Sequence, residues 1–463
     1  MTRAPNRIDD ASLASFLATR PELRFIDLLM PDLNGIDRGK RVDRGSAPSV
    51  FARGLQLPGS LFALDVLGGT IQATGLGFDE GDADRFCLPI AGTLFDVPWL
   101  GAEFAQAQVG MVDRDGRSFF GDPRARLAEV LEGFAAAGLT PVVALEYEFY
   151  FTDRERAPHG GPLPPRAPST GRREFRTQIN SMTDLDEYSS LLAQIDTACR
   201  AQNVPTTSAL AEYGPGQFEI NFSHSDDVLE ACDAALRFKR VVRAIARRNG
   251  LDATFMAKPY EESAGSGLHL HVSVLRSDGR NVFESEEPTG NATLRSAIAG
   301  TLETLAEGMA IFAPNANSWR RFRAEAYVPL TADWSVNNRG TALRVPMSDA
   351  ANRRLEHRVA GADANPYLVC AWVLAGVLRG MTQRLEAPAP LDGNAYHRTG
   401  LPTGAPLPLH WATAVERFDR SAFARAVLGE AFTQLYATVK AGELADFNRH
   451  ITPLEYEWYL HTL

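Results

Sequence analysis

The chain has 463 residues, of which 45% are hydrophobic and 22% charged, so it can bury a substantial core and is long enough for two or three domains. Its 47 basic and 57 acidic residues give a formal net charge of −10, which gives no indication of a nucleic-acid partner. No signal-peptide core follows the start, and no stretch approaches the roughly 20 apolar residues of a membrane span, so we expect a cytoplasmic protein without membrane association.

Residues 24 to about 112 have the pattern of short strands and turns. Strand-like segments are "FIDLL", "SLFALDVLGG" and "AGTLFDVPWL", and Gly and Pro interrupt them throughout. The pattern changes at Asp122, where Asp-Pro at the N-cap and first helical position begins a helix that Gly138 ends. We therefore predict a domain boundary near residue 115, with one domain over 1–115 and a second over 116–463.

Beyond residue 116, predicted strands alternate with long helices, which favours an α+β domain built on one large sheet. The expected strands are "PVVALEYEFYF", "GQFEINF", "LHLHVSVL", "ALRVP" and "RLEHRV". The expected helices cover 183–203, 226–249 with Ser225 as the cap, 290–310 and 366–386. Residues 154–175 contain five Pro and three Gly and are predicted to be a mobile surface loop.

Four cysteines are spread along the chain: Cys87, Cys199, Cys232 and Cys370. None belongs to a CxxC pair or has a neighbouring histidine, so neither a zinc knuckle nor a disulfide scaffold is indicated. We expect reduced, partly buried thiols.

Two pairs of carboxylates are candidate cation ligands. Alternate residues of a strand point to one face, so Glu146 and Glu148 lie side by side within an otherwise apolar strand. An edge strand with a solvated acidic face would also show this pattern, but the apolar neighbours favour buried carboxylates, which need a cation. In "AEYGPGQFEINF", the Gly-Pro-Gly turn can bring Glu212 and Glu219 back to one place.

A third motif, "GSGLHLHVSV", places His269, His271 and Ser273 on one face of a strand after a glycine-rich turn. A single histidine is more often structural than a ligand. Two on one strand face, after Gly265 and Gly267, favour an imidazole and phosphate site.

Arginine is denser between residues 314 and 358 than along the rest of the chain, and guanidinium groups suit carboxylate and phosphate oxygens. The residues are Arg320, Arg321, Arg323, Arg339, Arg344, Arg353, Arg354 and Arg358, with Glu356 among them. Together with the carboxylates and histidines, they provide ligands for hard divalent cations, for a triphosphate and for a carboxylate substrate. This combination is what acyl phosphorylation requires.

These motifs, in this order, resemble glutamine synthetase over nearly the whole chain. The matching blocks are "KPYEESAGSGLHLHVS" from Lys258, the Glu-x-Glu pair, "GPGQFE", "NSWRRF", "NNRGTALRVP" and "RRLEHR". The resemblance implies a glutamine synthetase-like α+β fold, with a small N-terminal β-grasp domain and a large C-terminal catalytic domain whose curved antiparallel sheet is flanked by helices. Within the superfamily the chain looks most like γ-glutamylputrescine synthetases and related γ-glutamylpolyamine ligases.

The resemblance also implies roles for individual residues. One metal would be held by Glu148, Glu212 and Glu219, and a second by Glu146, His269 and Glu356. Nucleotide contacts would come from His271, Ser273, Arg339, Arg344 and Arg354. Glutamate would be held by Gly265, Arg321 and Arg358. The implied catalytic residues are Asp65, Glu325 and Arg339.

Departures from the family pattern concern the second substrate. Ala264 stands where glutamine synthetases have Asn, and Tyr327 stands where the glutamate that closes the ammonium site is expected. We therefore expect a larger amine such as putrescine, with the ring faces of Tyr327 and Trp334 beside its alkyl chain. Its distal ammonium would meet Glu325 or Asp333, and Asp65 or Glu325 would remove the proton from its reacting nitrogen.

The implied reaction is ATP-dependent ligation of the glutamate γ-carboxylate to a primary amine through γ-glutamyl phosphate, with Mg²⁺ or Mn²⁺. Two alternatives stay open, an ammonia-using glutamine synthetase and a non-catalytic structural or binding member of the fold. The resemblance further implies a homo-oligomer of two stacked hexameric rings, with Asp65 acting across a subunit interface. The choice of amine, its base, the metal, regulation and modification of Tyr396 are left open.

Overall fold

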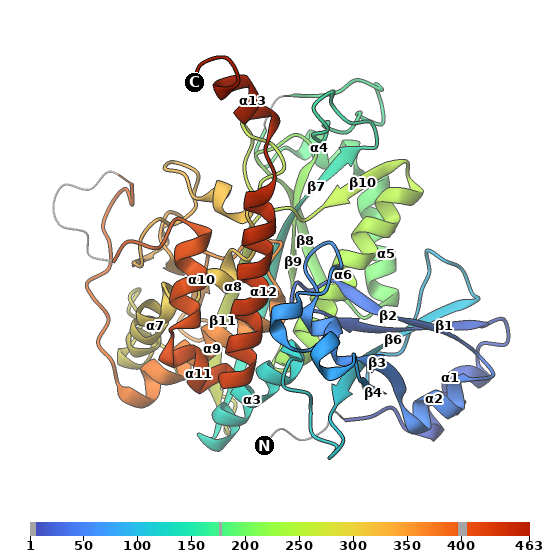
Figure 1. Cartoon of the computed structure of the whole chain (residues 1–463). Coiled ribbons are helices and arrows are strands. Elements are labelled where there is room, and N and C mark those ends of the chain that lie inside the picture. The colour runs from blue at the N-terminus through green and yellow to red at the C-terminus, as the bar shows by residue number, and fades with distance from the viewer. Residues whose placement is uncertain (1–5, 176–177, 397–404) are drawn as a thin grey trace.

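The structure, a computed structural model, describes residues 6–175, 178–396 and 405–463. Two β-sheets organise it, a six-stranded sheet within residues 25–112 and an eight-stranded sheet within residues 139–357. Figure 1 shows the blue N-terminal sheet to one side of the larger sheet, and the C-terminal helices packed in front of and beside it. The α+β class predicted from the sequence is confirmed.

The N-terminal sheet has the order β2-β1-β6-β4-β3, and β5 pairs with β6. β1 and β6 run parallel, whereas the other neighbours are antiparallel. The elements are α1 Asp10–Ala18, β1 Phe25–Pro31, β2 Asp37–Asp43, α2 Ala47–Arg53, β3 Leu55–Pro58, β4 Asp84–Pro89, β5 Phe95–Asp96 and β6 Phe104–Val112. Short 3₁₀ helices are η1 Gly59–Ala63, η2 Gln72–Thr74 and η3 Phe78–Glu80.

Two of the predicted N-terminal strands are wrong or shortened. The start of "SLFALDVLGG" is the 3₁₀ helix η1, because Phe62 is fully buried and packs on Phe119 with ring centroids 5.7 Å apart. Only Phe95 and Asp96 of "AGTLFDVPWL" form a strand. Local composition indicated extended backbone here, but packing against the following segment decided the conformation.

The larger sheet has the order β12-β13-β14-β11-β7-β9-β8, and β10 pairs with β7. All of its neighbours are antiparallel except β12 and β13, which run parallel, so the sheet is antiparallel as predicted apart from this one pair. Its strands are β7 Leu139–Asp153, β8 Thr206–Ala211, β9 Gln217–Phe222, β10 Leu251–Thr254, β11 Leu268–Arg276, β12 Trp334–Val336, β13 Leu343–Val345 and β14 Leu355–His357.

The helices of the catalytic region follow the predicted order, with corrected ends. They are α3 Pro123–Ala136, α4 Met182–Glu187, α5 Ser189–Ala201, α6 Val228–Arg248, α7 Ala292–Leu305, α8 Met309–Phe312, α9 Pro366–Gln383, α10 Trp411–Asp419, α11 Ala422–Leu428, α12 Glu430–Arg449 and α13 Pro453–Tyr459. A short 3₁₀ helix, η4, covers Ser318–Arg321. In place of the single helix predicted over 290–310, α7 ends at Leu305 and α8 begins at Met309, after Gly308.

Two predicted helix features are wrong. The single helix over 183–203 is divided at Tyr188, whose ring packs into the core against Phe151 and Phe218. Ser225 is not the cap of α6, because its backbone still pairs with Val143 of the sheet. The N-cap is Asp227, whose side chain accepts a hydrogen bond from the backbone of Glu230.

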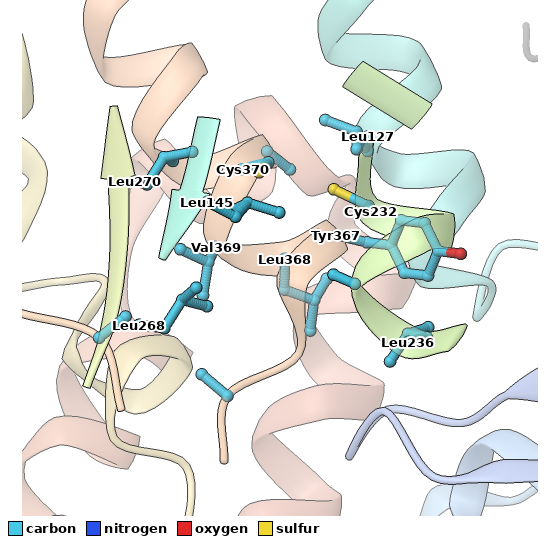
Figure 2. Packing of buried hydrophobic residues seen from close by; sticks show 14 of the residues in the cluster. Leu127, Leu145, Cys232, Leu236, Leu268, Leu270, Tyr367, Leu368, Val369 and Cys370 are labelled. Carbon is cyan, nitrogen blue, oxygen red and sulfur yellow. The ribbon is translucent and has the colours of Figure 1, made fainter. Parts of the chain in front are cut away.

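One face of the larger sheet packs on helices to form the main core (Figure 2). Leu145 of β7 and Leu268 and Leu270 of β11 meet Leu368 and Val369 of α9, and all five are 1% exposed or less. Because side chains alternate along a strand, residues 146, 148, 269 and 271 face the other way. The polar face is therefore fixed in place by the packed one.

Buried polar contacts join the N-terminal sheet to the catalytic region. The Gln106 amide donates to the Gln202 side chain at 2.7 Å, Arg240 reaches Asp27 at 2.8 Å, and Asn365 donates to the Asp32 carbonyl at 3.1 Å. The boundary near residue 115 falls between β6 and α3 and stays a prediction. So does the mobility of residues 154–175.

All four cysteines are free and fully buried, rather than partly buried as expected. Burial raises the pKa of Cys87 and Cys199 to about 12. Within the described parts of the chain, no helix combines the length and apolar character needed to cross a bilayer.

Candidate active site

The register of four strands brings carboxylates and imidazoles together on the polar face of the larger sheet. On β7, Glu146 lies opposite His269 of β11, and Glu148 lies opposite Glu219 of β9. On the other side of β11, Glu356 of β14 lies opposite His271. Sequence alternation predicted the shared face on each strand, and the register supplies the neighbours across strands.

His269 is at the centre of this group. Its Nδ1 lies 3.2 Å from a Glu146 oxygen and 3.9 Å from a Glu219 oxygen, and its Nε2 lies 3.9 Å from Glu148. One ligand atom each from Glu146, His269 and Glu356 lie within 4.8 Å of one another, and the same holds for Glu148, Glu219 and His269. The site can therefore offer carboxylate oxygens and an imidazole to a cation from two sides.

The grouping differs from that implied by the resemblance. Among the described residues, the compact set around Glu148 and Glu219 includes His269 and leaves out Glu212. Glu212 lies in the turn between β8 and β9, beyond the regular pairing of the strands, and burial followed by the charge of Glu148 raises its pKa. It is thus a neighbour of the group, and the metal roles of all six residues stay predictions.

Concentrated negative charge distinguishes this site electrostatically. Burial, followed by the charges of Glu146, Glu148 and Glu212, raises the pKa of Glu219 to about 9. Burial and Glu148 raise the pKa of Glu212 to about 8. Burial acts in the same direction on Glu146, but hydrogen bonds from His269 and His271 outweigh it, so its pKa lies below the usual range. This excess of carboxylate charge fits a divalent cation.

Glu356 and His271 link the cluster of Glu146, Glu148, Glu219 and His269 to the arginines. Glu356 is fully buried, accepts from Arg344 at 2.7 Å and also contacts Arg358. Burial by itself would raise the pKa of Glu356. The charges of Arg358, the two histidines and Arg344 together have the larger effect and lower this pKa to about 2. Arg354 donates to Nδ1 of His271 at 3.3 Å, so the other ring nitrogen of His271 is the donor to Glu146 at 2.9 Å.

The glycine-rich turn before β11 lies against Arg321. A Cβ atom on Gly265 would come within 2.6 Å of the Arg321 side chain and 2.8 Å of the Ala257 carbonyl oxygen, so a larger residue here would force the turn or Arg321 to shift. Gln217 donates to the Gly265 carbonyl at 3.0 Å, and the Tyr150 hydroxyl donates to the Ala264 carbonyl at 2.7 Å. The turn is therefore held by its backbone, and Ala264 keeps its place without a polar side chain.

A cleft of about 680 Å³ opens beside the carboxylates. Glu146, His271, Ser273 and Arg354 line one part of it, whereas Arg339 and Arg344, which were also predicted to contact a nucleotide, are not among its lining residues. The remaining lining includes residues that the sequence analysis did not identify: Thr207, Phe222, Ser223, His224, Asn281 and Asn352. Strand alternation and turn chemistry gave no signal for them, because they come from separate segments and meet only at the cleft.

Asp65 lies in another cavity of about 440 Å³, formed by the turn after η1, the end of α12 and residues 315–317. Its carboxylate accepts hydrogen bonds from the backbone of Leu67 and Gly69, both at 2.8 Å. It does not line the 680 Å³ cleft beside the carboxylates. Within one chain, Asp65 therefore lies apart from the cluster of glutamates around His269.

The segment after η4 contradicts part of the amine-site expectation. Trp334 is 1% exposed and its indole donates to the Pro388 carbonyl, so it offers no face to a substrate. Asp333 is equally buried, and its carboxylate accepts from Thr331 at 2.6 Å. Neither side chain is therefore available to an amine substrate. Glu325 and Tyr327 remain at the surface.

Arg339, a predicted site residue, and Tyr396, whose modification the sequence left open, lie in the same region. Arg339 is exposed, and its charge acts on the Glu212 carboxyl to lower its pKa, against burial and Glu148. Tyr396 is partly buried, and its hydroxyl donates to the Val328 carbonyl at 3.0 Å. Burial raises the pKa of Tyr396 to about 12. The segment 397–404 that follows it lies outside the described residues.

An α+β fold with a cluster of carboxylates and imidazoles, arginines and an adjoining cleft defines a class of enzyme-like sites suited to phosphoryl chemistry. The chain belongs to the glutamine synthetase family: residues 120–459 match the family described as "Glutamine synthetase, catalytic domain". This confirms the resemblance found in the sequence.

Two named relatives and one solved structure are similar to the chain over more than nine-tenths of its length. The chain is 42% identical to γ-glutamylputrescine synthetase PuuA of Escherichia coli K12, over 96% of this chain and 93% of that protein. It is 30% identical to a glutamate–isopropylamine ligase of a Pseudomonas species, over 93% of each chain. Among solved structures, a complex titled "GmaS/ADP complex-Conformation 1" superposes with a TM-score of 0.84 at 26% identity, over 97% of this chain and 99% of that one.

Proposed function

We propose that this protein is an ATP-dependent ligase that joins the γ-carboxylate of glutamate to a primary amine, giving a γ-glutamyl amide, ADP and phosphate. The observation that carries the proposal is the group of Glu146, Glu148, Glu219, His269 and Glu356, which adjoins a cleft large enough for a nucleotide. Relatives that are named as ligases of glutamate with putrescine or isopropylamine support the same reaction.

The donor set of the carboxylate group favours Mg²⁺ or Mn²⁺ over softer metals, because oxygens predominate. Such a cation, when bound, neutralises phosphate charge during transfer. The residues proposed to hold it are Glu146, Glu148, Glu212, Glu219, His269 and Glu356.

The chain's own residues would align the two reactants. His271, Ser273, Arg339, Arg344 and Arg354 would hold the triphosphate, while Arg321, Arg358 and the backbone of Gly265 would hold glutamate. The γ-phosphoryl group passes from ATP to the glutamate γ-carboxylate oxygen, breaking its bond to the β-phosphate oxygen. The amine nitrogen then attacks the acyl carbon and displaces phosphate.

The amine must lose a proton before or during this attack. A primary alkylamine has a pKa of about 10, so only roughly one molecule in a thousand is neutral at pH 7. Asp65, supplied by a neighbouring subunit, and Glu325 are the proposed bases. We propose putrescine or a related polyamine as the amine, since Ala264 and Tyr327 replace the polar residues that would close around ammonium.

An amine panel tests the proposal. Phosphate release with ATP and glutamate would be measured with putrescine, butylamine and ammonium at equal concentration, and the product identified by mass. The proposal expects amine-dependent release, greatest with putrescine. A clear preference for ammonium would assign the protein to the ammonia-using glutamine synthetases. Phosphate release with none of the three would favour a non-catalytic member.

We also propose a homo-oligomer of two stacked hexameric rings. An exposed apolar C-terminus supports an assembly, because Leu454, Tyr456, Trp458, Tyr459 and Leu460 of α13 and its end are all about half exposed or more. Figure 1 shows α13 projecting from one end of the molecule. Light scattering that finds a fully active monomer would overturn this assembly. The cytoplasmic location stays a prediction.

A further inference from the structure

Two tyrosines from distant parts of the chain meet beside the carboxylate group. Tyr213 follows Glu212 in the turn between β8 and β9, and Tyr327 belongs to the segment after η4. Their ring centroids lie 6.1 Å apart at an interplanar angle of 24°. We call this pair the aromatic lip.

The surrounding backbone holds Tyr327 in place. Glu325 and Tyr327 both have left-handed conformations, with φ of 62° and 52°, which are costly for residues other than glycine. The segment is anchored before them by Arg323, which donates to the Glu261 carbonyl at 3.2 Å, and after them by Tyr396, which donates to the Val328 carbonyl at 3.0 Å. The strained backbone thus directs the ring toward Tyr213.

Both rings nevertheless keep open surface. Tyr213 is 37% exposed and Tyr327 is 52% exposed, although each already covers part of the other. Two charged residues, Glu212 and Arg339, lie close enough to Tyr213 for their charges to act on its hydroxyl group. Exposed aromatic faces at the edge of an acidic group are suited to an alkyl chain that ends in a cation.

We infer that the aromatic lip selects the acceptor amine by binding the distal ammonium of a diamine, and that Tyr213 is a specificity-determining residue. This inference rests on the proposed ligase function. Neutral ammonia, the reactive form of ammonium, is too small to contact the rings while it attacks the acyl group. Butylamine offers the same chain as putrescine without the distal charge. The lip therefore discriminates by charge at a distance from the reacting nitrogen.

The first test is Tyr213→Leu, which keeps apolar volume and removes the ring face. The KM for putrescine is expected to rise about 10-fold, whereas the KM values for butylamine, ammonium and glutamate stay within about twofold. Tyr213→Phe keeps the ring and is expected to retain the putrescine KM within about threefold. The matched control is Phe78→Leu, which alters an 84% exposed ring on η3 and should change none of these values.

A double-mutant cycle tests whether the two rings act as one element. If they do, Tyr327→Leu and the Tyr213→Leu/Tyr327→Leu double variant raise the putrescine KM by about the same factor as Tyr213→Leu alone. Melting temperature and nucleotide binding would be measured for each variant to confirm folding, and Tyr213→Phe provides the comparison if Tyr213→Leu does not fold.

The outcomes separate the lip from the proposed function. A wild-type protein that makes no γ-glutamyl amide with any amine overturns the proposed function, and the inference with it. A wild-type protein that uses putrescine, with variants whose putrescine KM is unchanged, overturns the lip alone. An equal rise for putrescine and butylamine also overturns it, because the rings would then read only the alkyl chain.

Discussion

At the scale of single residues, His269 lies among three carboxylates that it cannot neutralise by itself. It is within 4 Å of Glu146, Glu148 and Glu219, and none of its shortest contacts to these groups is below 3.2 Å. Arg344 and Arg358 form ion pairs with Glu356. Glu148 and Glu219, in contrast, form no ion pair with an arginine among the residues that the structure describes. A cation between them would relieve this repulsion.

Removing one of these carboxylates should stop turnover. Glu148→Ala is expected to lower glutamate-dependent phosphate release at least about 100-fold, because a lost ligand weakens the cation and displaces the phosphoryl group. Steady-state phosphate release with saturating amine measures it. Glu155→Ala, two residues beyond the same strand and exposed, is the matched control. Wild-type turnover in Glu148→Ala would refute the metal assignment.

The raised pKa values of Glu212 and Glu219 predict how stability depends on pH. A carboxyl group whose folded pKa lies above the ordinary 4.5 contributes stability below pH 4.5 and loses it as pH rises through the folded values of about 8 and 9. The melting temperature of metal-free protein should therefore fall between pH 6 and 9. Added Mg²⁺ or Mn²⁺ should restore more of it at the higher pH.

Thermal melts with chelator or with metal, across this pH range, measure the effect. Glu219→Gln should flatten the pH dependence, because the amide has no proton to lose. Asp226→Asn, an exposed change on the loop before α6, is the control and should leave the slope unchanged. An unchanged slope in Glu219→Gln would contradict the electrostatic account.

At the scale of elements, the start of α6 shows how a strand can delay a helix. Ser225 still exchanges two backbone hydrogen bonds with Val143, at 2.9 and 2.8 Å, so it cannot adopt the capping position. Asp227 takes that role and accepts from the Glu230 backbone at 3.0 Å. The helix therefore begins two residues later than local sequence indicates, and continues under the sheet that carries the site.

The cap is open to a direct test. Asp227→Ala should destabilise the protein by about 1 kcal/mol, because the first turn of α6 loses a side-chain acceptor. Thermal or urea denaturation measures this, and the shift in melting temperature is expected to be about 1–3 °C for a chain of this size. Asp226→Ala removes a neighbouring exposed carboxylate that does not cap the helix. If both variants melt alike, the capping role of Asp227 is wrong.

At the scale of the whole molecule, a buried ion pair ties α12 to the N-terminal turns. Lys440 and Glu443 lie 2.8 Å apart with their side chains almost fully buried. Glu443 also accepts from the Asn34 amide at 3.1 Å and from the backbone of Val66 at 3.0 Å. The turn that carries Asp65 is thus fixed to α12 of its own chain.

If Asp65 acts in a neighbouring subunit, two inactive variants should complement each other. Asp65→Asn and Glu219→Gln chains, refolded together in equal amounts, should regain up to about a quarter of wild-type activity, because about one interface in four then joins an intact Asp65 to an intact acidic group. Phosphate release with putrescine measures it. Activity that equals the sum of the separate variants would show that Asp65 does not act across an interface.

The identity of the chemistry could be derived from local sequence, because it depends on short-range patterns. Alternation along strands put Glu146 beside Glu148 and His269 beside His271. The glycine turn at Gly265 directly precedes the strand of the two histidines. These features need no knowledge of what lies across the sheet. The ordered motifs then identified the family, which the match over residues 120–459 bears out.

Which groups meet was decided only by tertiary structure, since it depends on strand register and on contacts between segments far apart in the chain. Register placed His269 within reach of Glu219, and core packing turned Trp334 inward although its sequence position indicated a substrate contact. The approach of Tyr213 to Tyr327 required two turns and a strained backbone, for which no periodic pattern exists. Local chemistry is encoded in neighbouring residues, whereas amine selection depends on distances that only the folded chain sets.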